Sequence, residues 1–108
     1  IALDWAHLPL LPGAWDLSRD YCRPNRTFSI MDFAEPFVEQ GALDDEEFDN
    51  RMGVLCDPQT SGGLIVAVAP GSADAFACAF EREQGRPCAR IGTIVDTADA
   101  KIAFSDAR

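Results

Sequence analysis

The sequence predicts an α+β domain in which helices pack on a mixed β-sheet. The chain has 108 residues, of which 47% are hydrophobic and 25% charged, and this composition is typical of a single compact domain with its own core. Apolar residues recur at every second position in some segments and at helical spacing in others. These segments give the order strand, helix, helix, helix, strand, strand, helix, strand, strand. Because helices and strands alternate only in the second half, the order favours an α+β fold.

The N-terminal segment predicts one strand and one short helix. Large apolar residues alternate with smaller or polar ones over residues 1–5, as in a half-buried strand. Proline and glycine in residues 8–13 indicate a turn region, and residues 14–21 follow as a helix. Residues 23–26 are polar and predict a loop.

A second helix is predicted over residues 30–40. Ser29, followed three residues later by Asp32, resembles an N-terminal capping arrangement. Gly41 can end the helix in the left-handed conformation. Pro36 must kink or restart the helix, because proline has no amide hydrogen to donate.

A third helix is predicted from Asp44 or Asp45 to Arg51 or Met52. Residues 35–50 carry seven acidic side chains and no basic one. Such a cluster could chelate calcium, but it lacks the alternating oxygen ligands and the central glycine of an EF-hand loop. Acidic side chains in a first helical turn favour the helix through its dipole, so we interpret this block as a solvated helix face.

Two strands are predicted around the middle of the chain, with a polar turn between them. Residues 53–56 form a short apolar run, and residues 64–69 form a longer one that is apolar on both faces. A strand of the second kind is typical of the centre of a sheet that is covered on two sides. Residues 64–69 are therefore the strongest strand prediction in the chain.

The last third of the chain predicts a helix and a hairpin. Residues 73–84 form an amphipathic helix that Ser72 caps and Gly85 ends, with a phenylalanine stripe expected to face the core. Residues 88–95 and 101–104 are strand candidates, and the residues between them are numerous enough for a hairpin loop. The last four residues are expected to form a frayed tail.

Charge and composition exclude several classes of partner. The formal net charge is −9, with 18 acidic against 9 basic residues, whereas nucleic-acid binding requires cations that neutralise phosphates. The same charge opposes an anionic membrane surface, and no apolar run is long enough to span a bilayer. The first residues resemble neither a translation start nor a secretion signal. We therefore expect a piece of a longer cytoplasmic protein, with no nucleic-acid or membrane partner.

The cysteines predict packing rather than metal binding. No two of them form a C-x-x-C pair, and the chain has only one histidine, His7. A zinc site would need ligands gathered singly from across the fold, so we expect no metal ligands in this chain. A cysteine hydrolase using Cys56 and His7 would lack a third group to orient the pair. Free thiols in a reducing compartment are the preferred interpretation, and they concern Cys22, Cys56, Cys78 and Cys88.

The turn between the two central strands carries most of the chemical information. Three polar side chains there precede two glycines, and consecutive amides near paired glycines can form a concave anion site. The structural alternative is a tight turn in which Thr60 and Ser61 bond to nearby amides. The residues expected to contact a phosphate or a neighbouring domain are Asp57, Gln59, Thr60, Ser61, Gly62 and Gly63.

The segment Leu-Cys-Asp-Pro-Gln-Thr-Ser-Gly-Gly-Leu at residues 55–64 resembles the signature in the C-terminal domain of selenide, water dikinase, also called selenophosphate synthetase. Residues 8–14 and 89–95 are similar to other stretches of that domain. The resemblance implies an AIR-synthase-related C-terminal domain and places residues 1–108 as most of that domain in a two-domain enzyme.

The resemblance also implies an activity for the parent enzyme, which makes selenophosphate from selenide, ATP and water and releases AMP and phosphate. Magnesium is its cofactor, and the enzyme is typically a cytosolic homodimer. In the family, the reactive Cys or selenocysteine, its nearby Lys and the magnesium-binding aspartates lie upstream, mainly in the ATP-binding domain. We therefore expect no catalytic residue in this chain, and Lys101, its one lysine, is not assigned a catalytic role.

One stretch departs from the family pattern. The family commonly has Pro-Gly-Gly-Thr, any residue, then Arg-Asn, whereas residues 24–30 read Pro-Asn-Arg-Thr-Phe-Ser-Ile. Loss of two glycines removes a close backbone approach to a ligand. The change indicates either altered substrate handling or a structural segment that tolerates change. It also motivates a second hypothesis, a non-catalytic interaction module on the same scaffold.

Overall fold

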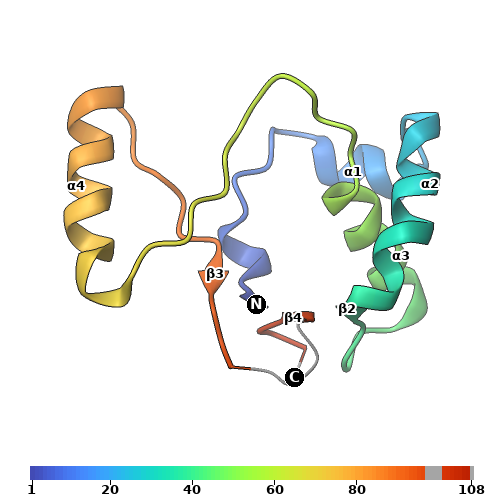
Figure 1. The fold of residues 1–108 in the computed structure, drawn as a ribbon. Coiled ribbons are helices and arrows are strands. Elements are labelled where there is room, and N and C mark those ends of the chain that lie inside the picture. The colour runs from blue at the N-terminus through green and yellow to red at the C-terminus, as the bar shows by residue number, and fades with distance from the viewer. Residues whose placement is uncertain (97–100, 108) are drawn as a thin grey trace.

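The computed structural model describes residues 1–96 and 101–107 (Figure 1). Its four α-helices are joined by short strands and 3-10 turns. In chain order the elements are β1 (Ala2–Leu3), η1 (Trp5–His7), α1 (Ala14–Arg19), α2 (Asn25–Ala34), η2 (Glu35–Phe37), β2 (Val38–Glu39), α3 (Asp45–Leu55), η3 (Pro70–Ser72), α4 (Ala73–Gln84), β3 (Gly92–Thr93) and β4 (Ile102–Phe104). Among these described residues, no helix has both the length and the apolar character needed to cross a bilayer.

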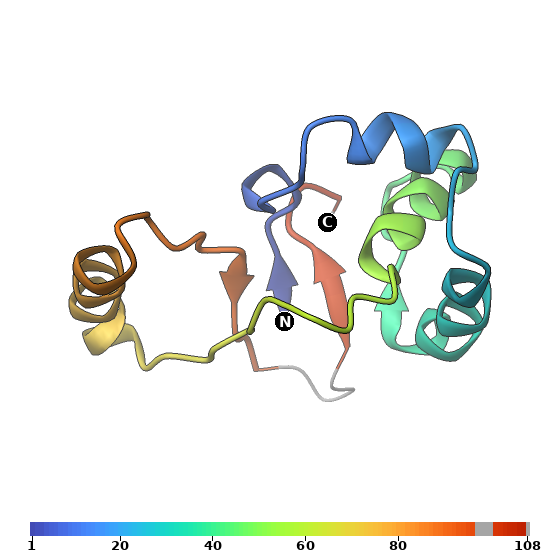
Figure 2. The same ribbon diagram turned by 90° about the horizontal axis from the view of Figure 1, so that it is seen from above.

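The strands form a four-stranded mixed sheet in the order β2-β4-β1-β3 (Figure 2). β4 is parallel to both β1 and β2, whereas β1 and β3 are antiparallel. The predicted α+β class is therefore confirmed. The predicted hairpin is wrong, because β1 lies between β3 and β4; residues 97–100 of its expected loop lie outside the described residues. The N-terminal strand is shorter than predicted, since Trp5 already belongs to η1.

The core forms where α3 meets the sheet. Leu3, Phe104 and Ala107 are its buried centre, and Phe48 and Leu55 of α3 pack against it. The start of α3 is confirmed, because the Asp44 side chain accepts a hydrogen bond of 2.8 Å from the amide of Glu47. The helix continues to Leu55, so the strand predicted at residues 53–56 is wrong. Burial of this last turn, including Met52 and Gly53, keeps the chain helical.

Helix α2 begins five residues earlier than predicted. Pro24 lies just before its first residue, where a missing amide hydrogen costs nothing, so the expected loop at residues 23–26 is shorter. Ser29 is not a cap, because its hydroxyl donates to the carbonyl of Arg26 within the helix. Pro36 lies in η2, after which the chain enters β2 rather than continuing as a helix.

The strand predicted at residues 64–69 is wrong. Leu64 is 93% exposed and Ile65 is 85% exposed, and the segment is an extended link between α3 and η3. High strand propensity needs a neighbouring strand that supplies hydrogen bonds and cover, and no described strand pairs with this segment.

Helix α4 stands apart from the other helices (Figures 1 and 2). Its bounds and the left-handed Gly85 after it are as predicted, although Ser72 makes no side-chain capping bond. No residue of α4 is buried, and the rings of Phe76 and Phe80 stack on each other at 6.3 Å. The expected packing of this stripe into the core is therefore wrong.

Two buried arginines tie α3 to the rest of the chain. The side chain of Arg23 is 1% exposed and donates to the Ser18 carbonyl, to Asp49 and to the Asn50 side chain. Gly53 leaves the space that Arg23 occupies, because a Cβ at this glycine would overlap the guanidinium.

The second arginine, Arg51, donates two hydrogen bonds of 2.9 Å to Asp106 and one to Glu47. Its guanidinium also lies over the rings of Trp5 and Phe104, at 4.9 and 5.0 Å from their centroids. Arg51 therefore connects α3 to both ends of the described chain.

Gly53→Ala tests the packing of Arg23. Helix propensity alone would make alanine more stable by about 1 kcal/mol, but overlap with a guanidinium held by three partners reverses the sign. We expect a net loss of about 1–3 kcal/mol in the free energy of unfolding, measured by urea denaturation. In an Arg23→Ala background the overlap with the guanidinium is gone and only the Ser18 hydroxyl, 2.7 Å from the new Cβ, remains close, so the loss from the same change should be clearly smaller. A loss of equal size in both backgrounds would contradict this account.

The Arg51–Asp106 pair predicts a pH dependence of stability. Hydrogen bonds from Arg51 lower the pKa of the Asp106 carboxyl. Because the pKa is lowered in the folded state, the stabilisation from this pair is complete above the pKa of the unfolded state, which is about 4. The stabilisation is lost as the pH falls through the pKa of the folded state. The difference in unfolding free energy between the wild type and Asp106→Asn should therefore shrink below about pH 4. A difference that stays constant from pH 7 to pH 2.5 would contradict this role of Asp106.

Candidate functional site

The segment predicted to contact a ligand or partner follows directly from α3. Cys56 closes the helix by donating its amide to Met52, and the amide of Asp57 donates to the Val54 carbonyl at 3.3 Å. The start of the segment is therefore fixed to the helix end. From there the chain arches away as an irregular loop (Figure 1). The prediction of a tight turn between two strands is wrong, because a helix precedes it and an extended link follows.

All six predicted site residues are exposed to solvent. In the described part of the chain, four of them have side-chain polar atoms with no hydrogen-bond partner, and the other two are glycines. The backbone amide of Gln59 donates to the backbone carbonyl of Asp57 at 2.8 Å. In the described part of the chain, no hydrogen bond engages the side chain of Thr60 or Ser61, so these hydroxyls do not satisfy local amides as the structural alternative supposed. All six residues are exposed, and they are Asp57, Gln59, Thr60, Ser61, Gly62 and Gly63.

The two glycines leave open space at the tip of the loop. A Cβ at either Gly62 or Gly63 would meet no described atom within 4 Å. Gly63 has a φ of 66°, which side chains with a Cβ rarely adopt, whereas Gly62 has no such restriction. The absence of a side chain at Gly62 is therefore not required by contacts within the described residues. An incoming group could approach the backbone closely at this position.

The cysteine next to the loop is poorly suited to act as a nucleophile. Cys56 is buried, and burial raises the pKa of its thiol, which favours the protonated, unreactive form. His7 instead forms a hydrogen bond of 2.8 Å between its Nδ1 and the Asp4 carboxylate. No described contact joins Cys56 to His7, so the structure does not assemble the cysteine hydrolase considered from the sequence.

Metal ligands do not gather in the described residues. Over residues 1–96 and 101–107, no group of three or more His, Cys, Asp or Glu side chains is placed to hold a metal ion. The acidic block of residues 44–47 starts α3, where its carboxylates meet the positive end of the helix dipole. All four cysteines are free thiols.

Two cavities were not predicted from the sequence. One lies between α2 and α3, has a volume of about 370 Å3, and combines carboxylates with an apolar floor that includes Phe48 and Met52. The other has a volume of about 240 Å3 and lies at the sheet beside His7. The three-residue spacing of Asp4 and His7 was the only sequence signal for the second cavity. None of the six loop residues lines either cavity.

Several known proteins related to this chain share one name. No protein-family profile and no solved structure matches the chain. A selenide, water dikinase of Pelobacter propionicus is 34% identical over 95 residues, which cover 88% of this chain and 23% of the relative. One from Bordetella bronchiseptica is 39% identical over 80 residues, covering 73% and 22%. One from Geobacter metallireducens is 34% identical over 105 residues, covering 97% and 29%.

The matches extend over most of this chain but over less than a third of each relative. The relatives' shared name agrees with the resemblance found in residues 55–64, and it is compatible with an AIR-synthase-related α+β domain. By sequence, the chain therefore belongs to the selenide, water dikinase family, of whose members it matches about a quarter of the length.

Proposed function

We propose that this chain is most of the C-terminal domain of an ATP-dependent selenide, water dikinase. The parent enzyme would make selenophosphate from selenide, ATP and water, with release of AMP and phosphate and with magnesium as cofactor. The names of the relatives support the reaction, and their greater length supports a parent with further domains. The upstream ATP-binding domain would be the partner of this chain in a cytoplasmic homodimer.

The chain on its own would have no catalytic activity. The family's reactive Cys or selenocysteine and its Lys are expected upstream, and the buried Cys56 is a poor substitute for that nucleophile. Phosphoryl transfer depends mostly on positioning and charge stabilisation, so a domain without a catalytic side chain can still affect the rate. Its contribution would be to help close the site around the phosphates or to hold the ATP-binding domain in place.

The exposed loop carries this proposal. The hydroxyls of Thr60 and Ser61 form no hydrogen bond with the described residues, and no described atom lies within 4 Å of the position that a Cβ would take at Gly62. Hydroxyl and amide groups are suitable donors to a phosphate oxygen, and a missing Cβ allows close approach. Only the start of the loop is anchored, through α3, so a partner that docks beside the helix end would meet these groups first.

The second candidate function is a non-catalytic interaction module on the same scaffold. The exposed Leu64 and Ile65 favour it, because neighbouring apolar side chains in solvent are typical of a surface that binds another protein. The departure from the family's glycine-containing pattern at residues 25–30 now gives less support to this module. These residues form the first part of α2, where glycine would weaken the helix. An upstream segment with a reactive Cys or selenocysteine and a nearby Lys would favour the enzyme, and its absence would favour the module.

Gly62→Val in the complete enzyme tests the role of the loop. A Cβ at this exposed position meets no described atom within 4 Å, so the thermal unfolding midpoint should stay within about 1 °C, consistent with a near-neutral surface substitution. If the loop approaches phosphate or the ATP-binding domain, selenide-dependent AMP release should fall by about tenfold or more, a loss of roughly 1.4 kcal/mol in transition-state stabilisation.

Gly71→Val is the matched control. Gly71 is also open to solvent and carries no positive φ, but it lies in η3, away from the loop. It should leave both activity and stability unchanged. Wild-type activity of Gly62→Val, or an equal loss in both variants, would remove the loop from the proposed function.

A further inference from the structure

A polar cavity lies at one edge of the sheet, separate from the loop that follows α3. β1 and β4 are parallel, so their carboxyl ends meet at this edge, and Asp4 and Ser105 are the first residues after them. Two backbone hydrogen bonds of 2.8 Å fix these two residues next to the neighbouring strands. The amide of Asp4 donates to the Ile91 carbonyl, and the amide of Ser105 donates to the Leu3 carbonyl. Polar groups at the carboxyl ends of parallel strands are a common setting for ligand sites.

Small residues make room for the cavity. Ala2 lies on the same face of β1 as Asp4, opposite the face that Leu3 gives to the core. Gly92 pairs with Leu3 so closely that a Cβ would overlap the Ala2 carbonyl. The resulting cavity has a volume of about 240 Å3, with Thr93 on the wall formed by β3. This volume exceeds that of a single small oxyanion.

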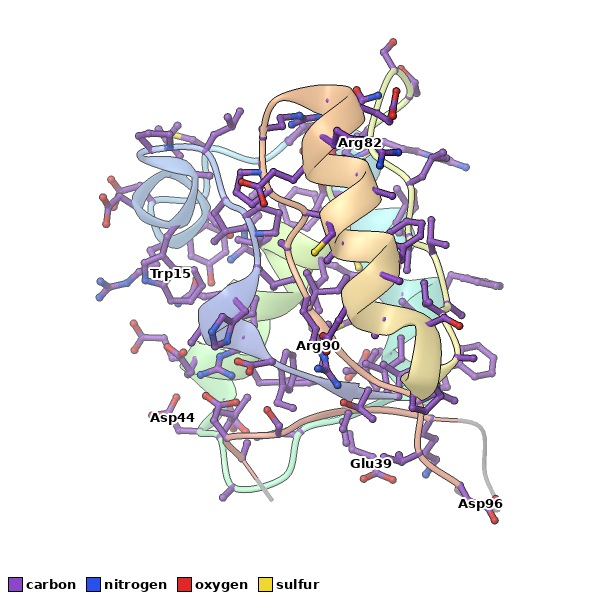
Figure 3. All side chains as sticks on the ribbon, turned by 90° about the vertical axis from the view of Figure 1, so that its left-hand side faces the viewer. Trp15, Glu39, Asp44, Arg82, Arg90 and Asp96 are labelled. Atoms are coloured by element: carbon purple, nitrogen blue, oxygen red, sulfur yellow. The ribbon has the colours of Figure 1, made fainter. Side chains whose placement is uncertain are left out.

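The cavity gathers hydrogen-bond donors and one unpaired cation. Arg90, just before β3, lines the cavity and lies beside the lower part of α4 in Figure 3. It forms no salt bridge with a described acid, whereas Arg23 and Arg51 are both held by carboxylates. Thr93 and Ser105, each of which carries a hydroxyl, line the same space.

The one carboxylate of the cavity is already engaged. Asp4 accepts the hydrogen bond from Nδ1 of His7, so its negative charge is directed to the imidazole. No described residue bonds to Nε2 of that ring. The residues that line the cavity carry a guanidinium, two hydroxyls and an imidazole, and their only carboxylate is already hydrogen-bonded to that imidazole. The excess of donors contrasts with the net charge of −9 of the chain.

We propose that this cavity binds a phosphate-type oxyanion, held mainly by the Arg90 guanidinium and the hydroxyls of Thr93 and Ser105. A planar guanidinium matches the oxygen spacing of phosphate, and hydroxyls supply further donors. The site is independent of the proposed function, because it shares no residue with the loop of residues 57–63. The cavity is open to solvent, so inorganic phosphate alone should bind weakly, with a dissociation constant in the millimolar range.

An NMR titration of the chain with inorganic phosphate at constant ionic strength tests the proposal. Saturable shifts are expected at the backbone amides of Gly92, Thr93 and Ser105. Arg90→Gln should weaken binding at least fivefold. Arg86→Gln removes the same charge from an exposed side chain outside the cavity, and it should change the affinity by less than twofold. Ser105→Ala, which keeps every charge, should weaken binding about two- to fivefold.

Further probes identify the source of the oxyanion. Tighter binding of glycerol phosphate than of inorganic phosphate would indicate a phosphorylated small molecule that fills the remaining volume, and the reverse order would indicate free phosphate; both support the site. Acetate binding as tightly as phosphate would overturn the phosphate class. Absence of saturable shifts, or equal weakening by Arg90→Gln and Arg86→Gln, would show only general charge attraction and would overturn the site itself.

Discussion

Arg51 is the side chain on which the arrangement of this domain depends. It reaches from α3 to Asp106 beyond β4 and lies over the ring of Trp5 just after β1, with only 7% of its side chain exposed. A buried guanidinium is stable only when carboxylates and ring faces replace its water, and Glu47, Asp106 and the two aromatic rings do so here. One side chain therefore joins α3 to the residues that follow β1 and β4.

The position of α3 decides where the chain goes after the helix. The end of α3 is held against the core through Leu55 and Cys56, and the loop starts from this fixed point. Between Asp57 and η3, the described backbone forms few hydrogen bonds with the rest of the chain, and apolar side chains such as Leu64 lie in solvent. A chain that exposes its best strand sequence in this way is suited to a surface that another domain covers. The chain matches only about a quarter of the length of its relatives, which leaves room in a longer protein for a domain that covers this surface.

The sequence predicted what local chemistry determines. The acidic first turn predicted the start of α3, and Gly85 as a left-handed stop predicted the end of α4, because each acts within one helical turn. Strand pairing depends on distant residues, so the hairpin and the strand at residues 64–69 were predicted wrongly. The loop residues could be singled out because they are consecutive. The Arg90 cavity could not, because it exists only when β1 pairs with both β3 and β4.

Hydrogen–deuterium exchange, measured on this chain and on the complete enzyme, tests most directly whether residues 57–69 are reserved for a partner. Amides of α3, β1 and β4 should be protected in both samples. Amides of residues 59–68 should exchange nearly as fast as in an unstructured peptide in the chain alone and become strongly protected in the complete enzyme. Protection already present in the chain alone would show that the segment belongs to its own fold, and fast exchange in both samples would show that no partner covers it; either result would contradict the account.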